Sequence, residues 1–140
     1  MSKLVTSGKI LALDHKKIEN IKNVKLLQMN FLDKNTKEQI LEFFNGELDV
    51  ILSDMASDTT GNKSLDCIRT NQLCIEVINF SSNFLKPNGV LISKLFMGED
   101  FLEVKDLAKS KFKIVNFFKP ESSRNESKET YLHCTSLKTL

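Results

Sequence analysis

Four polar side chains stand where short apolar runs of this sequence end. Asp14, Asp54 and Lys94 each close such a run, and Asn30 lies just past another. If the runs are parallel strands, their carboxyl ends meet at one edge of a sheet, where α/β proteins place their sites. Polar residues also simply begin loops, and that interpretation suffices for any one of the four. The coincidence of all four favours a functional site.

The residue types suggest nucleoside binding and proton transfer. An acid after the second strand of such a sheet commonly accepts from the two ribose hydroxyls of a nucleoside cofactor, and Asp14 has that position. Asn30 could accept from an adenine amino group, less strongly than a carboxylate would. Asp54 and Lys94 face each other if their strands are neighbours. A lysine base needs a pKa lowered towards neutrality and Asp54 alone would raise it, so a plain ion pair is an equal alternative.

Other catalytic motifs are absent. The sequence has no dinucleotide fingerprint, P-loop, HExxH or GxSxG, and no Cys/His spacing typical of a metal site. His15 and His133 are isolated and are interpreted as surface or edge residues. The three cysteines include no CxxC pair, which favours reduced thiols in a cytosolic-type compartment. No apolar run approaches the ~20 residues that span a bilayer. We expect no metal, no membrane contact and a cytoplasmic location.

The elements that would position these residues alternate in type. Apolar runs predict strands near residues 9–13, 25–29, 49–53, 89–94, 112–118 and 130–135. Helical spacing predicts helices over 36–44, 65–85 and 100–110, with Gly46 ending the first and Pro87-Asn88-Gly89 the second. This alternation indicates an α/β fold, with a mostly parallel sheet, helices on both faces and an antiparallel hairpin at the edge. A chain of 140 residues fits a single domain.

Charge is unevenly distributed along the chain. Twenty basic and 18 acidic residues give a net charge of +2, and 41% of the residues are hydrophobic, which excludes a disordered tail. Residues 105–128 hold seven Lys or Arg and three Asp or Glu, a local charge of +4, whereas residues 1–104 carry −2. The basic stretch is therefore a candidate for contact with a polyanion.

Several ordered motifs extend these observations. They are Ser53-Asp54-Met55-Ala56 followed by Gly61 and Asp66, the segment Leu85–Gly89, the segment Lys94–Glu99, and Lys119-Pro120 followed by Ser123-Arg124, Ser127, Glu129 and Tyr131. Together they resemble the FtsJ/RrmJ (RlmE-like) family of large-subunit ribosomal RNA 2′-O-methyltransferases. The resemblance runs from about Gly8 to Thr135, nearly the whole chain.

The resemblance implies a Rossmann-like methyltransferase fold, S-adenosyl-L-methionine as cofactor, and methylation of a ribose 2′-hydroxyl, of uridine, in ribosomal RNA. By position, Asp14 matches the acid that binds the cofactor ribose. Asn30 stands where the family usually carries an adenine-contacting Asp. Asp54 matches the acid beside the methionine moiety and the catalytic centre. Lys94 and Glu129 match the catalytic Lys and Glu.

Methyl transfer is an in-line displacement, so the enzyme mainly positions its substrates and helps to remove one proton. Lys94 would accept or stabilise that proton, and Asp54 and Glu129 would orient Lys94 and the substrate. The basic stretch with Lys113, Lys119 and Arg124 would hold phosphates of the large ribosomal subunit's RNA, which would make binding sensitive to salt.

The sequence departs from the family at its start. The family's N-terminal helix with a further catalytic Lys, its first strand and its loop G-x-x-P-G-G-W have no counterpart, and Met1–Ser7 match the tail of the helix after that loop. We expect an N-terminally truncated FtsJ-like domain over 1–140, whose flanking strands close together or recruit a partner chain that supplies the segment. The alternative function is a catalytically impaired fragment or a non-catalytic RNA-binding remnant. In a eukaryote, a mitochondrial location is the alternative to the cytoplasm.

Overall fold

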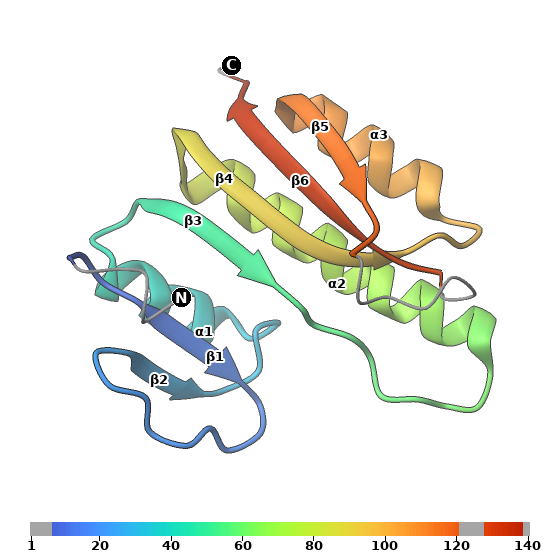
Figure 1. The fold of residues 1–140 in the computed structure, drawn as a ribbon. Coiled ribbons are helices and arrows are strands. Elements are labelled where there is room, and N and C mark those ends of the chain that lie inside the picture. The colour runs from blue at the N-terminus through green and yellow to red at the C-terminus, as the bar shows by residue number, and fades with distance from the viewer. Residues whose placement is uncertain (1–6, 121–127, 139–140) are drawn as a thin grey trace. The chain divides into compact units, whose positions relative to one another are not determined.

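The computed structural model describes residues 7–120 and 128–138. The chain divides into two compact units, Met1–Glu47 and Leu48–Leu140, and strands and helices alternate in each of them (Figure 1). The α/β class expected from the sequence is confirmed. The expected single domain stays a prediction.

The first unit holds a pair of parallel strands and one helix. β1 (Leu11–Asp14) pairs with β2 (Lys25–Gln28), and α1 (Lys34–Phe43) follows. Past the helix, Gly46 adopts a φ of +94° and its N–H donates to the carbonyl of Leu41 at 2.8 Å. This left-handed turn ends the helix where the glycine predicted it.

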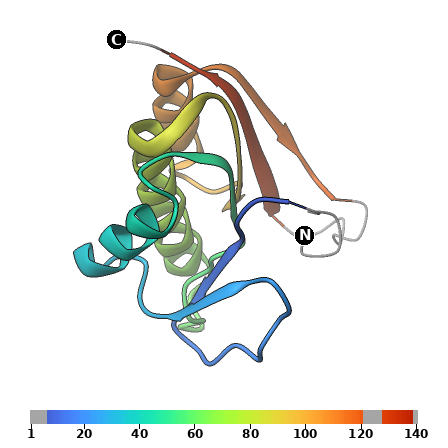
Figure 2. The same cartoon turned by 90° about the vertical axis from the view of Figure 1, so that its left-hand side faces the viewer.

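The second unit is a mixed four-stranded sheet with two helices. Its elements are β3 (Leu48–Ser53), α2 (Lys63–Phe84), β4 (Leu85–Phe96), α3 (Phe101–Lys111), β5 (Phe112–Phe118) and β6 (Glu129–Leu137). The strand order is β3-β4-β6-β5, with β3 parallel to β4, and β6 antiparallel to both β4 and β5. The antiparallel pair expected at the edge is thus confirmed. Both helices of this unit lie on the same side of its sheet (Figure 2). Helices on both faces of one sheet stay a prediction, because α1 belongs to the other unit.

Buried and half-buried residues alternate along β4, which gives the sheet one buried face and one more open face. Leu91 and Leu95 of β4 and Leu132 of β6 are fully buried in the core. Ile92 and Lys94, which lie between those β4 residues in sequence, are half-buried. Because successive side chains of a strand point to opposite faces, Lys94 projects from the face opposite the helices.

β4 begins earlier than the sequence predicted, at Leu85 instead of residue 89. Leu85 pairs with Leu48 of β3, and the register is irregular between there and the regular ladder that starts at Val90. Pro87 lies in this irregular part, which is where strands accept proline. A Cβ at Gly89 would lie 2.6 Å from the Leu85 side chain and 2.8 Å from a β3 carbonyl, so the close approach of the strands requires glycine.

Candidate active site

A lysine, two acids and a tyrosine gather at one end of the four-stranded sheet. Lys94 Nζ lies 3.0 Å from Asp54 Oδ1 and 3.4 Å from Glu129 Oε2. The Tyr131 hydroxyl donates to Asp54 Oδ1 at 2.6 Å. The structure therefore brings together the three residues expected to be catalytic, and it adds Tyr131 to them.

The strand register produces this cluster. β3 and β4 are parallel neighbours and their ladder ends one residue before Asp54 and Lys94, so these two side chains emerge next to each other. On the other side of β4, Lys94 is opposite Tyr131 of β6. Glu129 lies two residues before Tyr131, and a spacing of two places both side chains on the same face of the sheet as Lys94.

The loop that follows Asp54 is anchored to the start of α2. The Asp66 carboxylate accepts from the N–H of Thr60 at 3.0 Å and from its hydroxyl at 2.7 Å. Asn62 caps the helix by accepting from the N–H of Leu65 at 3.2 Å. Asp66, one of the motif residues, thus holds the chain that leads away from Asp54.

A buried asparagine holds the other side of the site. Asn71 of α2 is fully buried. Its Oδ1 accepts from the N–H of Phe96 at 2.8 Å, and its Nδ2 donates to the Phe96 carbonyl at 3.0 Å and to Asp100 Oδ1 at 2.7 Å. Asn71 therefore pairs with both backbone groups of the last residue of β4, as a neighbouring strand would, two residues past Lys94.

The surroundings keep Lys94 charged. Its side chain is 14% exposed, and this burial alone would lower its pKa. The hydrogen bond and charge of Asp54, followed by those of Glu129, outweigh burial and raise the pKa of Lys94 above its ordinary value. Burial raises the pKa of Asp54, but the hydrogen bonds from Tyr131 and Lys94 and the lysine charge lower it overall.

Tyr131 acts in this cluster as a hydrogen-bond donor. Burial raises the pKa of its phenol, and the contact with the Asp54 carboxylate raises it further. At neutral pH these shifts keep Lys94 as an ammonium group, Asp54 as a carboxylate and Tyr131 as a protonated phenol. Such an arrangement can hold a neutral hydroxyl and stabilise negative charge that develops on its oxygen.

The first unit places Asp14 and Asn30 at or just past the carboxyl ends of β1 and β2. Asp14 Oδ1 accepts from the N–H of Lys16 at 3.1 Å, and the side chain is 49% exposed. Asn30 Oδ1 accepts from the N–H of Leu32 at 3.0 Å, so one lone pair of this oxygen is already used and one is left for a ligand. Both side chains are exposed, with acceptor capacity that fits the nucleoside contacts expected of them.

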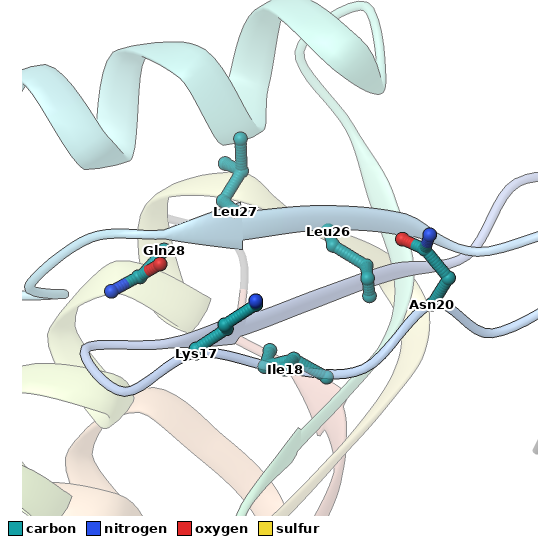
Figure 3. Close-up of a pocket in the computed structure, with 6 residues that line it drawn as sticks. All are labelled: Lys17, Ile18, Asn20, Leu26, Leu27 and Gln28. Carbon is teal, nitrogen blue, oxygen red and sulfur yellow. The ribbon is translucent and has the colours of Figure 1, made fainter.

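The first unit also holds a small pocket. Its volume is about 210 Å³, and it is lined by Lys17, Ile18, Asn20, Leu26, Leu27 and Gln28 (Figure 3). Neither Asp14 nor Asn30 lines it, although Gln28, one of its lining residues, is the register partner of Asp14.

The residues expected to bind RNA lie at different ends of β5. Lys119 directly follows Phe118, whose register partner is Tyr131 of the cluster. Lys113 is the second residue of β5 and therefore lies at the opposite end of the strand. Arg124 falls outside the described residues. Of the described residues, Lys119 therefore lies at the end of β5 near the cluster and Lys113 at the other end, and contact of these residues with RNA stays a prediction.

Two absences hold for residues 7–120 and 128–138. Over these ranges, no three His, Cys, Asp or Glu side chains are grouped in a way that could hold a metal ion. Over the same ranges, none of the helices combines the length and the apolarity of a membrane span.

Comparisons with known proteins place the chain in a family. A family model described as FtsJ-like methyltransferase matches residues 1–137. The Ribosomal RNA large subunit methyltransferase E of Pelagibacter ubique (strain HTCC1062) is 41% identical over 138 residues, which cover 99% of this chain and 68% of that protein. The protein of the same name from Rickettsia akari (strain Hartford) is 44% identical over 126 residues, 90% of this chain and 56% of its own length. The chain thus spans roughly half to two thirds of these relatives.

Solved structures share the fold. A crystal structure from Plasmodium falciparum, described as a ribosomal RNA methyltransferase, matches with a TM-score of 0.79 at 27% identity, over 92% of this chain and 72% of that one. Human Methyltransferase-like protein 13, in complex with SAH, matches with a TM-score of 0.56 at 19% identity, over 84% of this chain and 51% of that one. The Rossmann-like methyltransferase fold expected from the sequence is confirmed.

Proposed function

Because the chain belongs to the FtsJ-like methyltransferase family, we propose that it methylates a ribose 2′-hydroxyl, of uridine, in large-subunit ribosomal RNA. The observation that carries the proposal is the contact of Lys94 with both Asp54 and Glu129. These are the residues to which the resemblance assigns catalysis, and they come from three different parts of the sequence. Relatives named for this activity at 41% and 44% identity support it.

Lys94 is proposed to work as a cation. S-adenosylmethionine, when bound, supplies the methyl group. The ammonium group at Lys94 Nζ donates a hydrogen bond to the 2′-oxygen and stabilises the negative charge that develops as its proton leaves. The carboxylates of Asp54 and Glu129 hold Nζ in place, and one of the two takes that proton. The raised pKa of Lys94 favours this role over that of a neutral base, which would first have to lose its own proton.

Asp14 and Asn30 are proposed to contact the nucleoside of the cofactor, and Asp54 its methionine part. An exposed carboxylate such as Asp14 can accept from two neighbouring ribose hydroxyls, so Asp14→Ala should weaken S-adenosylmethionine binding about tenfold or more. Asn30→Asp should tighten it several-fold, because a carboxylate accepts more strongly than an amide. Calorimetry measures both changes. Asp33→Asn, an exposed acid of the same unit, is the matched control and should bind as the wild type does.

The test of the function is transfer of a labelled methyl group to large ribosomal subunits, followed by digestion of the RNA to nucleosides. The wild-type chain should yield a 2′-O-methylated nucleoside, and Lys94→Met should yield none. Lys94→Arg should keep a measurable fraction of the activity, because arginine preserves the positive charge and cannot serve as a base. A wild-type chain that labels no ribosomal RNA, or a Lys94→Met variant that labels it equally, would overturn the proposal.

The non-catalytic RNA-binding alternative is not favoured. A function that only binds RNA gives no reason for Asp54, Lys94 and Glu129 to converge from three parts of the sequence. A cytoplasmic location and a partner chain that supplies the Gly-rich segment stay predictions.

A further inference from the structure

Phe118 and Tyr131 form a parallel aromatic pair beside Lys94. Their ring centroids lie 5.7 Å apart with the planes inclined by 21°. Phe118 of β5 is the register partner of Tyr131 in β6, and Tyr131 is the register partner of Lys94 in β4. One row across three strands therefore carries the ammonium group, the phenol and an aromatic ring that is 44% exposed.

We propose that the Phe118 ring is a stacking surface for an unpaired base of the RNA substrate, on the methylated nucleotide or its immediate neighbour. The inference rests on the proposed function and names the part of the substrate that this position recognises. Adjacent strands lie about 4.8 Å apart, so Phe118 is two strand spacings, roughly 10 Å, from Lys94 along the row. A nucleotide whose 2′-hydroxyl lies at Lys94 has its own base, or that of the next nucleotide, within this reach.

The direction in which Phe118 points separates it from its neighbour in sequence. Phe117 packs against Phe101 of α3, with ring centroids 4.9 Å apart. Successive strand residues point to opposite faces, so Phe118 points away from α3 and shares the face of Lys94. An aromatic ring that is partly open to solvent on the same face as a catalytic group is what base stacking requires.

The position of the ring beside the Lys94 cluster favours RNA, the substrate of the proposed function, as its occupant. Lys94 lies in the same row, and Lys119 is the residue that follows Phe118. RNA offers both of the required features at once, because its bases stack on aromatic rings and its phosphates are attracted by lysines. An apolar surface of another protein would match the ring but would bring no ribose hydroxyl to Lys94.

Three substitutions separate stacking from simple packing. In the full chain, Phe118→Tyr keeps a π-face, Phe118→Leu keeps only apolar bulk, and Phe118→Ala removes both. If a base stacks here, the tyrosine variant should match the wild type. The leucine and alanine variants should raise the KM for RNA about tenfold, the usual effect of losing one base–aromatic stack, while kcat and the affinity for S-adenosylmethionine stay unchanged.

A substrate oligonucleotide with 2-aminopurine at the methylated position or next to it reports stacking directly. The wild type and Phe118→Tyr should quench its fluorescence, and Phe118→Leu should not. The salt dependence of binding provides a second readout, because Lys119→Gln should reduce its slope and Phe118→Ala should leave the slope unchanged.

The outcomes also separate this inference from the proposed function. If the wild type methylates RNA and Phe118→Leu performs equally well, the ring only packs on Tyr131 and the stacking proposal is wrong, while the proposed function stands. If Phe118→Ala leaves RNA binding unchanged and instead abolishes association between protein chains, the occupant is a protein. If the wild type neither binds nor methylates the RNA, both proposals fail together.

Discussion

Two lysine–aspartate contacts of the same length connect β4 to β3 or to the residue that directly follows β3. Lys94 Nζ lies 3.0 Å from Asp54 Oδ1, and Lys86 Nζ lies 3.0 Å from Asp49 Oδ1. Their surroundings differ. The side chain of Lys94 is 14% exposed and also contacts Glu129, whereas that of Lys86 is 43% exposed and its partner is 78% exposed.

The difference shows that the distance within an ion pair does not identify a site. An exposed pair such as Lys86–Asp49 is surrounded by water and contributes about 0–1 kcal/mol to stability. At Lys94, burial and a second carboxylate fix the ammonium group, and Tyr131 fixes the aspartate. What distinguishes the candidate site is the number of partners that converge on one half-buried charge.

The largest expected effect comes from removing each lysine in turn. Lys94→Ala should lower kcat for methyl transfer by about 100-fold or more, because the group that stabilises the developing charge is lost. Lys86→Ala should leave kcat within twofold of the wild type. Incorporation of a labelled methyl group into ribosomal RNA measures both, and urea unfolding shows whether each variant is folded.

An equal fall of kcat in Lys94→Ala and Lys86→Ala would contradict the distinction between the two ion pairs. They would mean that the ion pairs matter only because they connect β3 to β4. A loss confined to Lys94→Ala in a protein of unchanged stability would assign the effect to chemistry.

The next effect concerns Asn71, which secures the end of β4 near Lys94. Asn71→Ala leaves the N–H and carbonyl of Phe96 without these partners, and Asp100 loses its donor. Because buried polar groups that lose their partners cost about 1–3 kcal/mol, the free energy of unfolding should fall by about 2 kcal/mol in urea denaturation. Asn79→Ala, an exposed asparagine on the same helix, should change it by less than about 0.5 kcal/mol. Similar losses in both variants would contradict the assignment.

Helices and strands could be predicted from the sequence where the hydrophobic pattern of a single segment determines them. The alternation over residues 112–118 predicted β5 with the bounds that the structure has, and helical spacing predicted α2 to within two residues. The start of β4 could not be predicted, because Pro87 and Gly89 are typical of turns and only the approach of β3 makes them part of a strand. The arrangement of strands in two sheets depends on pairings between distant segments, which local patterns do not specify.

The site could be predicted from strand ends and motifs, with gaps that have physical causes. The partner of Tyr131 lies 77 residues away in sequence, and only its spacing of two from Glu129 hints that both share a face. Asn71 lies three residues before Cys74 and therefore on the same face of α2, and both residues are buried. Because buried polar side chains are normally hydrogen-bonded, this spacing could have indicated that Asn71 holds a neighbouring segment. Lys113 was assigned from the net charge of its segment, which does not specify where on the sheet a residue lies, and its contact with RNA stays a prediction.

A smaller effect is expected from Tyr131→Phe. This variant tests whether the hydrogen bond from Tyr131 is what distinguishes Asp54 from Asp49. The ring that stacks on Phe118 is kept, and only the 2.6 Å hydrogen bond to Asp54 is lost. Loss of this donor raises the pKa of Asp54 towards its ordinary value, so the carboxylate becomes protonated at a higher pH. We expect kcat to fall about tenfold or less and the acid limb of its pH profile to move upwards. An unchanged profile would show that Tyr131 does not act through Asp54.

The smallest expected effect is on the pH dependence of stability. Asp54 has a lowered pKa in the folded protein, so its contribution is present above the ordinary value of 3.8 and is lost as pH falls through the folded pKa. Lys94 has a raised pKa, so its contribution is present below the ordinary value of 10.5 and is lost as pH rises through the folded pKa. Asp54→Asn should therefore flatten the stability curve at both extremes. The differences should stay below about 1 kcal/mol, because Asp54 is 71% exposed and water screens its charge. Asp49→Asn, measured by urea unfolding over the same pH range, is the control. If it flattens both extremes as much as Asp54→Asn does, the two ion pairs are energetically alike, and the distinction between them must come from catalysis alone.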